Sequence, residues 1–379
     1  MLDSLLSLPL EQQVGQFFYI GLPGTDLDEE TRLLIEHVRP GGIIIFGRNV
    51  ASPEQLRNLL DGIRSMLEVE PLFGIDQEGG LVDRLRRIMT PMPSARTIRQ
   101  HGDLAGARAL GRITAETLRI LGFNMNFAPV MSIMTDERDL LSNGLYSRSF
   151  GRSPGEVLGY TMVYLRALQG MGCMGCLKHF PGIGAGEVDS HEEMPLVNLS
   201  HDDLMAQDLA PYIELFQRED DRVRAVMVSH GGFPNIDIRQ GVAGGRVEPA
   251  SLNKNIVTTL LREELGYSHL VVTDDLEMGA IAKYVPIDQA VRRAFDAGQD
   301  MLLICSRSEL IKHGYDVLLK AVREGEISQE RIRASLKNIA EFKSLVQPPL
   351  RFDKERFDQL SEEVSVLNRK LNYTYGGAI

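Results

Sequence analysis

Short apolar runs that alternate with helical patterns constrain the fold of this chain more than any other feature. Eight such runs occur, each followed by a polar or glycine-bearing turn, at residues 17–22, 42–46, 72–75, 124–130, 173–177, 224–228, 269–273 and 301–305. Apolar strands separated by helices pair in parallel, with helices covering both faces of the sheet. Eight βα units are the number that closes a barrel, so we expect an α/β fold of the TIM-type (β/α)8 barrel class.

Apolar residues at helical spacing predict the segments between these strands. Ser52 followed by Pro53 marks the start of one helix, with an N-cap residue and proline at the first helical position. The other expected helices cover 104–121, 153–168, 204–217, 249–265, 287–297 and 308–322. An open, doubly wound sheet is the alternative, but the first strand is not followed by G-x-G-x-x-G, which disfavours a dinucleotide-binding fold.

Two further helical stretches follow the eighth unit, at 328–346 and 352–371, on either side of Pro348 and Pro349. A chain of 379 residues is long enough for one large α/β domain. We therefore take residues 1–347 as the barrel and residues 348–379 as a C-terminal helical extension packed on it.

Charge and composition restrict the partners and the location. The net charge of −11 argues against nucleic acid or an anionic membrane as the main partner. No apolar stretch approaches eighteen residues, and residues 1–16 lack the positive region and cleavage site of a signal peptide. We expect a cytoplasmic protein, and a monomer.

The three cysteines are too few for a disulfide framework. Cys173 and Cys176 form a C-x-x-C pair, which can be a redox or metal motif. The sequence has no second pair, and the segment has the composition of a buried strand. We therefore favour two inert core thiols.

The segment 178–195, KHFPGIGAGEVDSHEEMP, carries a dense set of polar residues and three glycines that favour a mobile loop. Asp189 precedes His191 by two residues, so its carboxylate can reach the imidazole, fix its tautomer and raise its basicity. On a mobile loop, such a pair can transfer protons. A lone D-x-H also occurs in ordinary polar loops, so the interpretation depends on the rest of the chain.

Polar side chains gather at the carboxyl ends of the predicted strands, where a barrel carries its chemistry. They are Asp76 and Arg84 after the third strand, Arg148 after the fourth, Lys178 and His179 after the fifth, His230 after the sixth, and Asp274 and Asp275 after the seventh. Each has a structural alternative: an ion pair, a helix cap or a buried imidazole. Because all would face one mouth of the barrel, we interpret them as a site.

A buried aspartate opposite a mobile acid fits displacement at the anomeric carbon of a sugar. One group attacks or stabilises the cationic centre, and the other protonates the leaving oxygen. Charge-assisted hydrogen bonds to sugar hydroxyls and an acetamido group would come from Asp76, Arg84, Arg148, Lys178 and His179. The histidines lack H-E-x-x-H spacing and form no compact cluster with carboxylates, so we expect no metal and no cofactor.

Eight motifs occur in an order that resembles glycoside hydrolase family 3, in its single-domain β-N-acetylglucosaminidase branch (the NagZ type). They are GIIIFGRN, FGIDQEGGLVDRL, NFAPV, SRSFG, KHFPG, DSHEEMP, VVTDDLEM and AGQDMLLI, within residues 13–344. KHFPG with a following D-S-H is the most specific, because other members of the family use a glutamate acid/base on another domain.

The resemblance implies a retaining double displacement. Asp274 looks like the nucleophile, and His191 looks like the general acid/base oriented by Asp189. The five residues named above as sugar ligands match the family's sugar-binding positions. The implied substrates are terminal β-linked N-acetylglucosamine residues, typically on muropeptides recovered from the cell wall in bacterial cytoplasm. The ordinary histidine pKa of about 6.5 suits both acid and base duty near neutrality.

Two positions depart from the family pattern. Ile183 stands where KHFPGHG has a second histidine, and Ser132 stands where the strand-four motif usually has aspartate. Two other functions stay open. One is phosphorolysis, since a neutral imidazole would not repel phosphate as a carboxylate would, and the other is a sugar-binding barrel without turnover.

Overall fold

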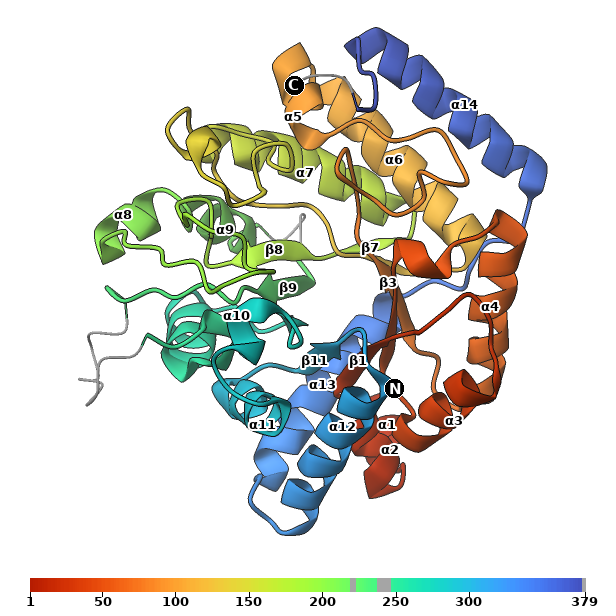
Figure 1. Ribbon diagram of the computed structural model, residues 1–379, viewed down its shortest axis with the longest axis vertical. Helices are drawn as coiled ribbons and strands as arrows, with labels where there is room; N and C mark the ends of the chain where they lie inside the picture. Colours follow the sequence, from red (N-terminus) through yellow and green to blue (C-terminus); the bar gives the residue numbers. More distant parts are fainter. Residues whose placement is uncertain (219–222, 237–246, 377–379) are drawn as a thin grey trace.

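The computed structural model describes residues 1–218, 223–236 and 247–376, and these form a parallel barrel surrounded by helices (Figure 1). The sheet order is β7-β6-β3-β2-β1-β11-β10-β9-β8, and every neighbouring pair is parallel. The segments β7 and β8 at its two ends are consecutive pieces of one strand, interrupted at Cys176, so the sheet closes on itself. The expected TIM-type barrel is confirmed. The strands are β1 (Phe18–Gly21), β2 (Gly42–Ile45), β3 (Leu72–Ile75), β6 (Met125–Asn126), β7 (Met174–Gly175), β8 (Leu177–Phe180), β9 (Ala225–Val228), β10 (Leu270–Asp275) and β11 (Met301–Ile304).

The barrel interior is filled by large side chains set against glycines. The ring of Tyr19 on β1 packs edge-on against Phe127, with centroids 5.2 Å apart. A Cβ on Gly42 would lie 2.4 Å from the Tyr19 ring, and one on Gly74 would lie 2.3 Å from its hydroxyl. Close packing leaves no room for the Tyr19 side chain together with a side chain at position 42 or 74. The glycines of β2 and β3 therefore make space for the aromatic core.

The helices connect successive strands and cover the barrel, as the alternating pattern predicts (Figure 1). Ser52 caps α4 as expected, because its Oγ accepts a hydrogen bond from the Gln55 N–H (3.1 Å). The α-helices are α1 (Leu2–Leu6), α2 (Leu10–Gly15), α3 (Glu29–Val38), α4 (Pro53–Met66), α5 (Ala95–His101), α6 (Leu104–Leu121), α7 (Pro154–Gly170), α8 (His201–Ala206), α9 (Ala210–Phe216), α10 (Gly279–Ala282), α11 (Ile287–Ala297), α12 (Ser308–Arg323), α13 (Gln329–Leu345) and α14 (Lys354–Leu371). Short 3₁₀ turns lie at η1 (Gly47–Asn49), η2 (Arg138–Leu140) and η4 (Ala250–Leu252), and η5 (Asn255–Glu264) is a π-helix.

The single helix expected over 204–217 is wrong, because α8 and α9 divide this segment. Asp208 lies between them and turns inward, where both of its oxygens accept hydrogen bonds from Arg138 at 2.9 Å. Both side chains are buried, so the ion pair between them stabilises the structure more than an unbroken helix over this segment would. Pro211 lies in the first turn of α9, where its missing N–H costs no hydrogen bond within the helix. The segment expected as a helix over 249–265 is likewise divided, into η4 and η5.

The C-terminal helix α14 runs along α6 on the outside of the barrel (Figure 1). Arg356 on α14 binds Glu116 on α6 through two hydrogen bonds of 2.6 and 2.8 Å. The division of the chain at residue 347 stays a prediction. In the described part of the chain, no helix has a long enough apolar stretch to span a bilayer.

Candidate active site

A cavity of about 330 Å³ lies at the carboxyl ends of the strands. Seven of the eight residues given a catalytic or sugar-binding role above line it, and the eighth, Asp189, binds one of the seven. The seven are Asp76, Arg84, Arg148, Lys178, His179, His191 and Asp274. The structure therefore brings together side chains that are up to 198 positions apart in the sequence (76 to 274).

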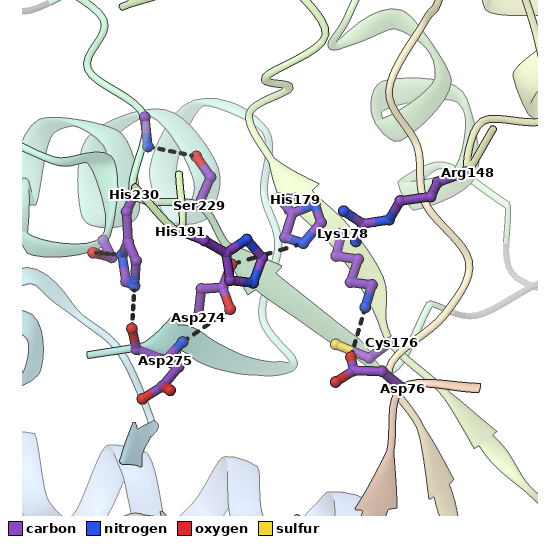
Figure 2. Close-up of polar contacts among 12 residues, drawn as sticks. Asp76, Arg148, Cys176, Lys178, His179, His191, Ser229, His230, Asp274 and Asp275 are labelled. Carbon is purple, nitrogen blue, oxygen red and sulfur yellow. Dashed lines mark hydrogen bonds and ion pairs between the residues drawn. The ribbon is translucent and has the colours of Figure 1, made fainter. Parts of the chain in front are cut away.

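Asp274 enters the cavity from β10, beside two imidazoles (Figure 2). Strand β10 extends through Asp275, so the expectation that both aspartates follow the strand is wrong by two residues. Burial favours the neutral acid, but His179 and His230 nearby and the Asp275 N–H outweigh it and lower the pKa of Asp274 below its ordinary value. Asp274 is therefore an ionised carboxylate at neutral pH.

His179 lies in β8 together with Lys178, and not after the strand as the sequence predicts. Its Nε2 is 3.7 Å from Asp274 Oδ2. Burial lowers the pKa of His179 to about 3, so the ring is neutral near pH 7. Its Nδ1 has no hydrogen-bond partner among the described residues. The ring can therefore bind a polar group of a ligand without adding charge.

Five side chains of alternating charge form one connected cluster beside Asp274. Lys178 Nζ donates to Asp76 Oδ1 at 2.7 Å and lies 2.6 Å from Glu78 Oε1. Arg148 donates to both oxygens of Glu78, at 2.8 and 3.0 Å. Arg84 Nη2 lies 3.6 Å from Asp76 Oδ2. Three cations and two anions thus hold each other rigidly in the cavity wall.

Glu78 is a site residue that the sequence reasoning missed. It lies in β4 (Gln77–Gly79), which forms a short hairpin with β5 (Val82–Asp83) after β3. Burial would raise its pKa, but Arg148 and Lys178 outweigh burial and hold the pKa of Glu78 well below its ordinary range. Asp76 and Glu78 are two residues apart, and extended chain directs such side chains to the same face. That spacing could have identified Glu78.

His191 reaches the cavity from the loop after β8 and is 67% exposed (Figure 2). Its Nδ1 is 2.8 Å from Asp189 Oδ1, and this carboxylate also accepts the His191 backbone N–H at 2.9 Å. The hydrogen bond to Asp189 raises the pKa of His191, assisted by the charge of Asp274. The same hydrogen bond places a proton on His191 Nδ1 and leaves Nε2 available for proton transfer. The predicted D-x-H pair therefore forms.

His230 takes a structural position next to this site. Its Nε2 is 2.9 Å from the Asp275 carbonyl oxygen, which can only accept, so Nε2 carries the proton. Its Nδ1 then accepts from the Ser251 hydroxyl at 2.7 Å. The first contact holds the backbone of the residue that follows Asp274, and the second fixes the orientation of the His230 ring.

The two departures from the family pattern lie outside the lining of the cavity. Ile183 is buried in an apolar cluster that includes Val197 and Phe233. Ser132 is also buried, and its Oγ has no hydrogen-bond partner within the described structure. Both residues are therefore buried in the protein beyond the cavity lining and cannot contact a bound sugar directly.

Within the described ranges, no group of three or more histidine, cysteine or carboxylate side chains is arranged to hold a metal ion. Cys173 and Cys176 are both buried and unpaired with each other. Burial raises the pKa of Cys173 to about 12, so it is a neutral thiol near pH 7.

A parallel barrel with an ionised strand-end aspartate and a loop imidazole at one cavity defines a class of protein. It is the class of barrel enzymes that cleave glycosidic bonds.

Comparison with known proteins gives the family. Residues 9–342 match the glycosyl hydrolase family 3 N terminal domain. A β-hexosaminidase of Alkalilimnicola ehrlichii is 35% identical over 77% of this chain and 81% of its own length. The solved family 3 β-N-acetylglucosaminidase of Paenibacillus sp. str. FPU-7 superposes with a TM-score of 0.84 at 34% identity, over 95% of this chain and 69% of that one. M tuberculosis LpqI superposes with a TM-score of 0.79 at 30% identity, over 92% and 96%.

The chain therefore belongs to glycosyl hydrolase family 3 and is a glycoside hydrolase. The family expected from its motifs is confirmed.

Proposed function

We propose that this chain is a retaining exo-β-N-acetylglucosaminidase that removes terminal β-linked N-acetylglucosamine. The activity of a β-N-acetylhexosaminidase is supported by the β-hexosaminidase and β-N-acetylglucosaminidase relatives. The observation that carries the proposal is the meeting of ionised Asp274 with the His191–Asp189 pair at one cavity.

In the first step, an oxygen of Asp274 attacks the anomeric carbon and forms a new C–O bond. The bond from that carbon to the leaving oxygen breaks, and protonated His191 gives its Nε2 proton to this oxygen. Asp189 accepts a hydrogen bond from the Nδ1–H of His191 throughout and so stabilises the charged imidazole before transfer. The products are a glycosyl-enzyme and a free alcohol.

In the second step, the now neutral His191 takes a proton from water as the water oxygen attacks the same carbon. The bond to Asp274 breaks, and the carboxylate is restored. Two inversions give a product with retained stereochemistry. Asp274 must stay ionised in both steps, which the lowered pKa of its carboxyl favours.

The charged cluster is proposed to hold the sugar. Its members offer both donors and acceptors, and hydrogen bonds to ionised groups are stronger than neutral ones. The ligands would be four of its members, Asp76, Arg84, Arg148 and Lys178, together with the neutral ring of His179. A cavity of about 330 Å³ lies at the lower end of the range for small-ligand sites, which suits one terminal sugar ring. We place its natural substrates among muropeptides from the cell wall.

Trapping the glycosyl-enzyme tests the proposal directly. A fluorinated N-acetylglucosaminide with an activated leaving group should label the wild type, and peptide mapping should find the label on Asp274. An Asp274→Asn variant should stay unlabelled and should not release aglycone from an activated aryl N-acetylglucosaminide. A label elsewhere, or no release by the wild type above this variant, would refute the proposal.

The acceptor is tested separately. The wild type should release free N-acetylglucosamine at the same rate with and without inorganic phosphate. Formation of sugar 1-phosphate would instead identify a phosphorylase, for which a histidine acid/base is also suited.

A further inference from the structure

The loop that carries His191 is seated on α10, the helix that follows Asp274 by five residues. The Gly279 N–H donates to the His191 carbonyl at 3.1 Å, and the Ala280 N–H donates to the Ser190 carbonyl at 3.3 Å. Both donors belong to the first turn of the helix, where backbone N–H groups have no partner within the helix. The proposed nucleophile and the proposed acid/base are therefore held by one continuous segment, β10 and α10.

The loop can approach α10 this closely because residue 279 has no side chain. A Cβ on Gly279 would lie 2.3 Å from the Glu192 carbonyl oxygen and 2.7 Å from the His191 carbonyl oxygen. Both are backbone atoms, so neither can rotate away as a side chain would. The φ angle of Gly279 is not in the left-handed region. Glycine is therefore required here for space and not for backbone conformation.

Elsewhere the loop is tied to other parts of the barrel. At its entry, Asn143 Nδ2 donates to the carbonyls of Gly184 and Gly186, each at 3.0 Å. At its exit, the Gly232 N–H donates to the Pro195 carbonyl at 2.8 Å.

At the tip of the loop, an ion pair between Lys283 and Glu193 at 3.1 Å adds to the two backbone hydrogen bonds with α10. That pair is exposed on both sides, so it contributes little. Val188, three residues before His191, forms a β-bridge with Ser142, but the carbonyls of Ser190 and His191 bind α10, so the contacts with α10 hold the backbone at His191 itself.

We propose that Gly279 is a positioning residue: its missing side chain lets the loop settle on α10 and so sets the distance between His191 and Asp274. The inference rests on the proposed function, because it acts through the roles assigned there to these two residues. Gly279 does not contact the sugar.

The test is Gly279→Ala, measured as kcat/KM on two substrates. An alkyl N-acetylglucosaminide needs proton donation to its leaving oxygen, whereas a dinitrophenyl N-acetylglucosaminide does not. With the loop displaced, we expect kcat/KM to fall by about tenfold or more on the alkyl substrate and by less than about threefold on the dinitrophenyl substrate. The melting temperature should stay within a few degrees of the wild type.

Gly155→Ala is the matched control. Gly155 also lies in the first turn of a helix, α7, but a Cβ there would meet no described atom within 4 Å. Both substrates should be cleaved at wild-type rates by this variant. A loss in Gly155→Ala equal to that in Gly279→Ala would overturn the assignment.

A chemical readout separates positioning from general damage. Azide can attack the anomeric carbon of the glycosyl-enzyme without losing a proton, so it needs no base. In Gly279→Ala, azide should raise kcat on the dinitrophenyl substrate and yield the β-glycosyl azide, as it should in His191→Ala. Equal losses on both substrates without azide rescue would overturn the inference.

Ala280→Pro gives a second, independent variant if Gly279→Ala does not fold. Proline is accepted in the first turn of a helix, and here it removes the N–H that holds Ser190. It should reproduce the loss confined to the alkyl substrate. If both loop-seat variants behave as wild type while His191→Ala is impaired, only the inference fails. If Asp274→Asn retains activity, the proposed function itself fails.

Discussion

Replacing Glu78 by glutamine should destabilise the barrel strongly, although the change only exchanges one oxygen for a nitrogen. Glu78 is buried and accepts two hydrogen bonds from Arg148, and it lies 2.6 Å from Lys178 Nζ. Glutamine keeps one acceptor oxygen but removes the charge and turns the other position into a donor facing a cation. Lys178 retains Asp76 as a partner, whereas Arg148 loses its carboxylate.

The size of the effect follows from this geometry. Removing one partner of a buried ion pair costs about 3–5 kcal/mol, because the remaining charge is left without compensation. Since Lys178 keeps one carboxylate, we expect the lower end, about 3 kcal/mol in the free energy of unfolding at pH 7. The folded-state pKa of Glu78 is lowered, so its contribution is present above its ordinary pKa and is lost as the pH falls toward the folded value. The wild type and the variant should therefore converge in acid.

Urea unfolding of the two proteins at pH 7 and at about pH 3, well below the ordinary pKa of a glutamate, measures this difference. Glu193→Gln is the control, since Glu193 also pairs with a lysine but is exposed, and it should change stability by less than about 1 kcal/mol. A Glu78→Gln variant within about 0.5 kcal/mol of the wild type at pH 7 would refute the view that this carboxylate compensates buried cations.

Three further predictions concern catalysis. Asp189→Asn removes the charge that raises the pKa of His191, so the basic limb of the kcat/KM–pH profile should move to lower pH; an unmoved limb would separate Asp189 from the acid/base. His191→Ala should lower kcat/KM by about 10²–10⁴ on an alkyl glycoside and far less on a dinitrophenyl glycoside, and equal losses would count against His191 as the acid. Lys178→Ala should raise KM about tenfold or more through loss of a charged hydrogen bond to the sugar, and unchanged kinetics would remove Lys178 from the site.

Reasoning from the sequence predicted the fold and the positions of most site residues, because both depend on the types and spacing of neighbouring residues. Apolar runs at strand length, separated by helical periodicity, predict parallel strands wherever the chain lies. Helix α6 begins and ends at the predicted residues, 104 and 121, since Asp103 caps its start and Gly122 adopts the left-handed conformation after its end. The carboxyl end of each strand then follows from the direction of the chain.

The same reasoning did not predict contacts between segments that are distant in the sequence. The helix expected over 204–217 is divided because Asp208 binds Arg138, seventy residues away, and local periodicity carries no sign of that pair. Glu78 was overlooked because its partners are distant in the sequence: Arg148 lies in the connection after β6, and Lys178 lies in β8. Its charge state depends on both.

The amino-acid sequence by itself thus determined the barrel, the motifs of the family and the D-x-H pair, since each is written in the order and spacing of neighbouring residues. Only the tertiary structure decided that Asp274 stays ionised although it is buried, that His179 is neutral and that Gly279 leaves room for the His191 loop. The physical reason is that burial, electrostatic interaction and van der Waals contact depend on distance in space, which the closing of the barrel sets.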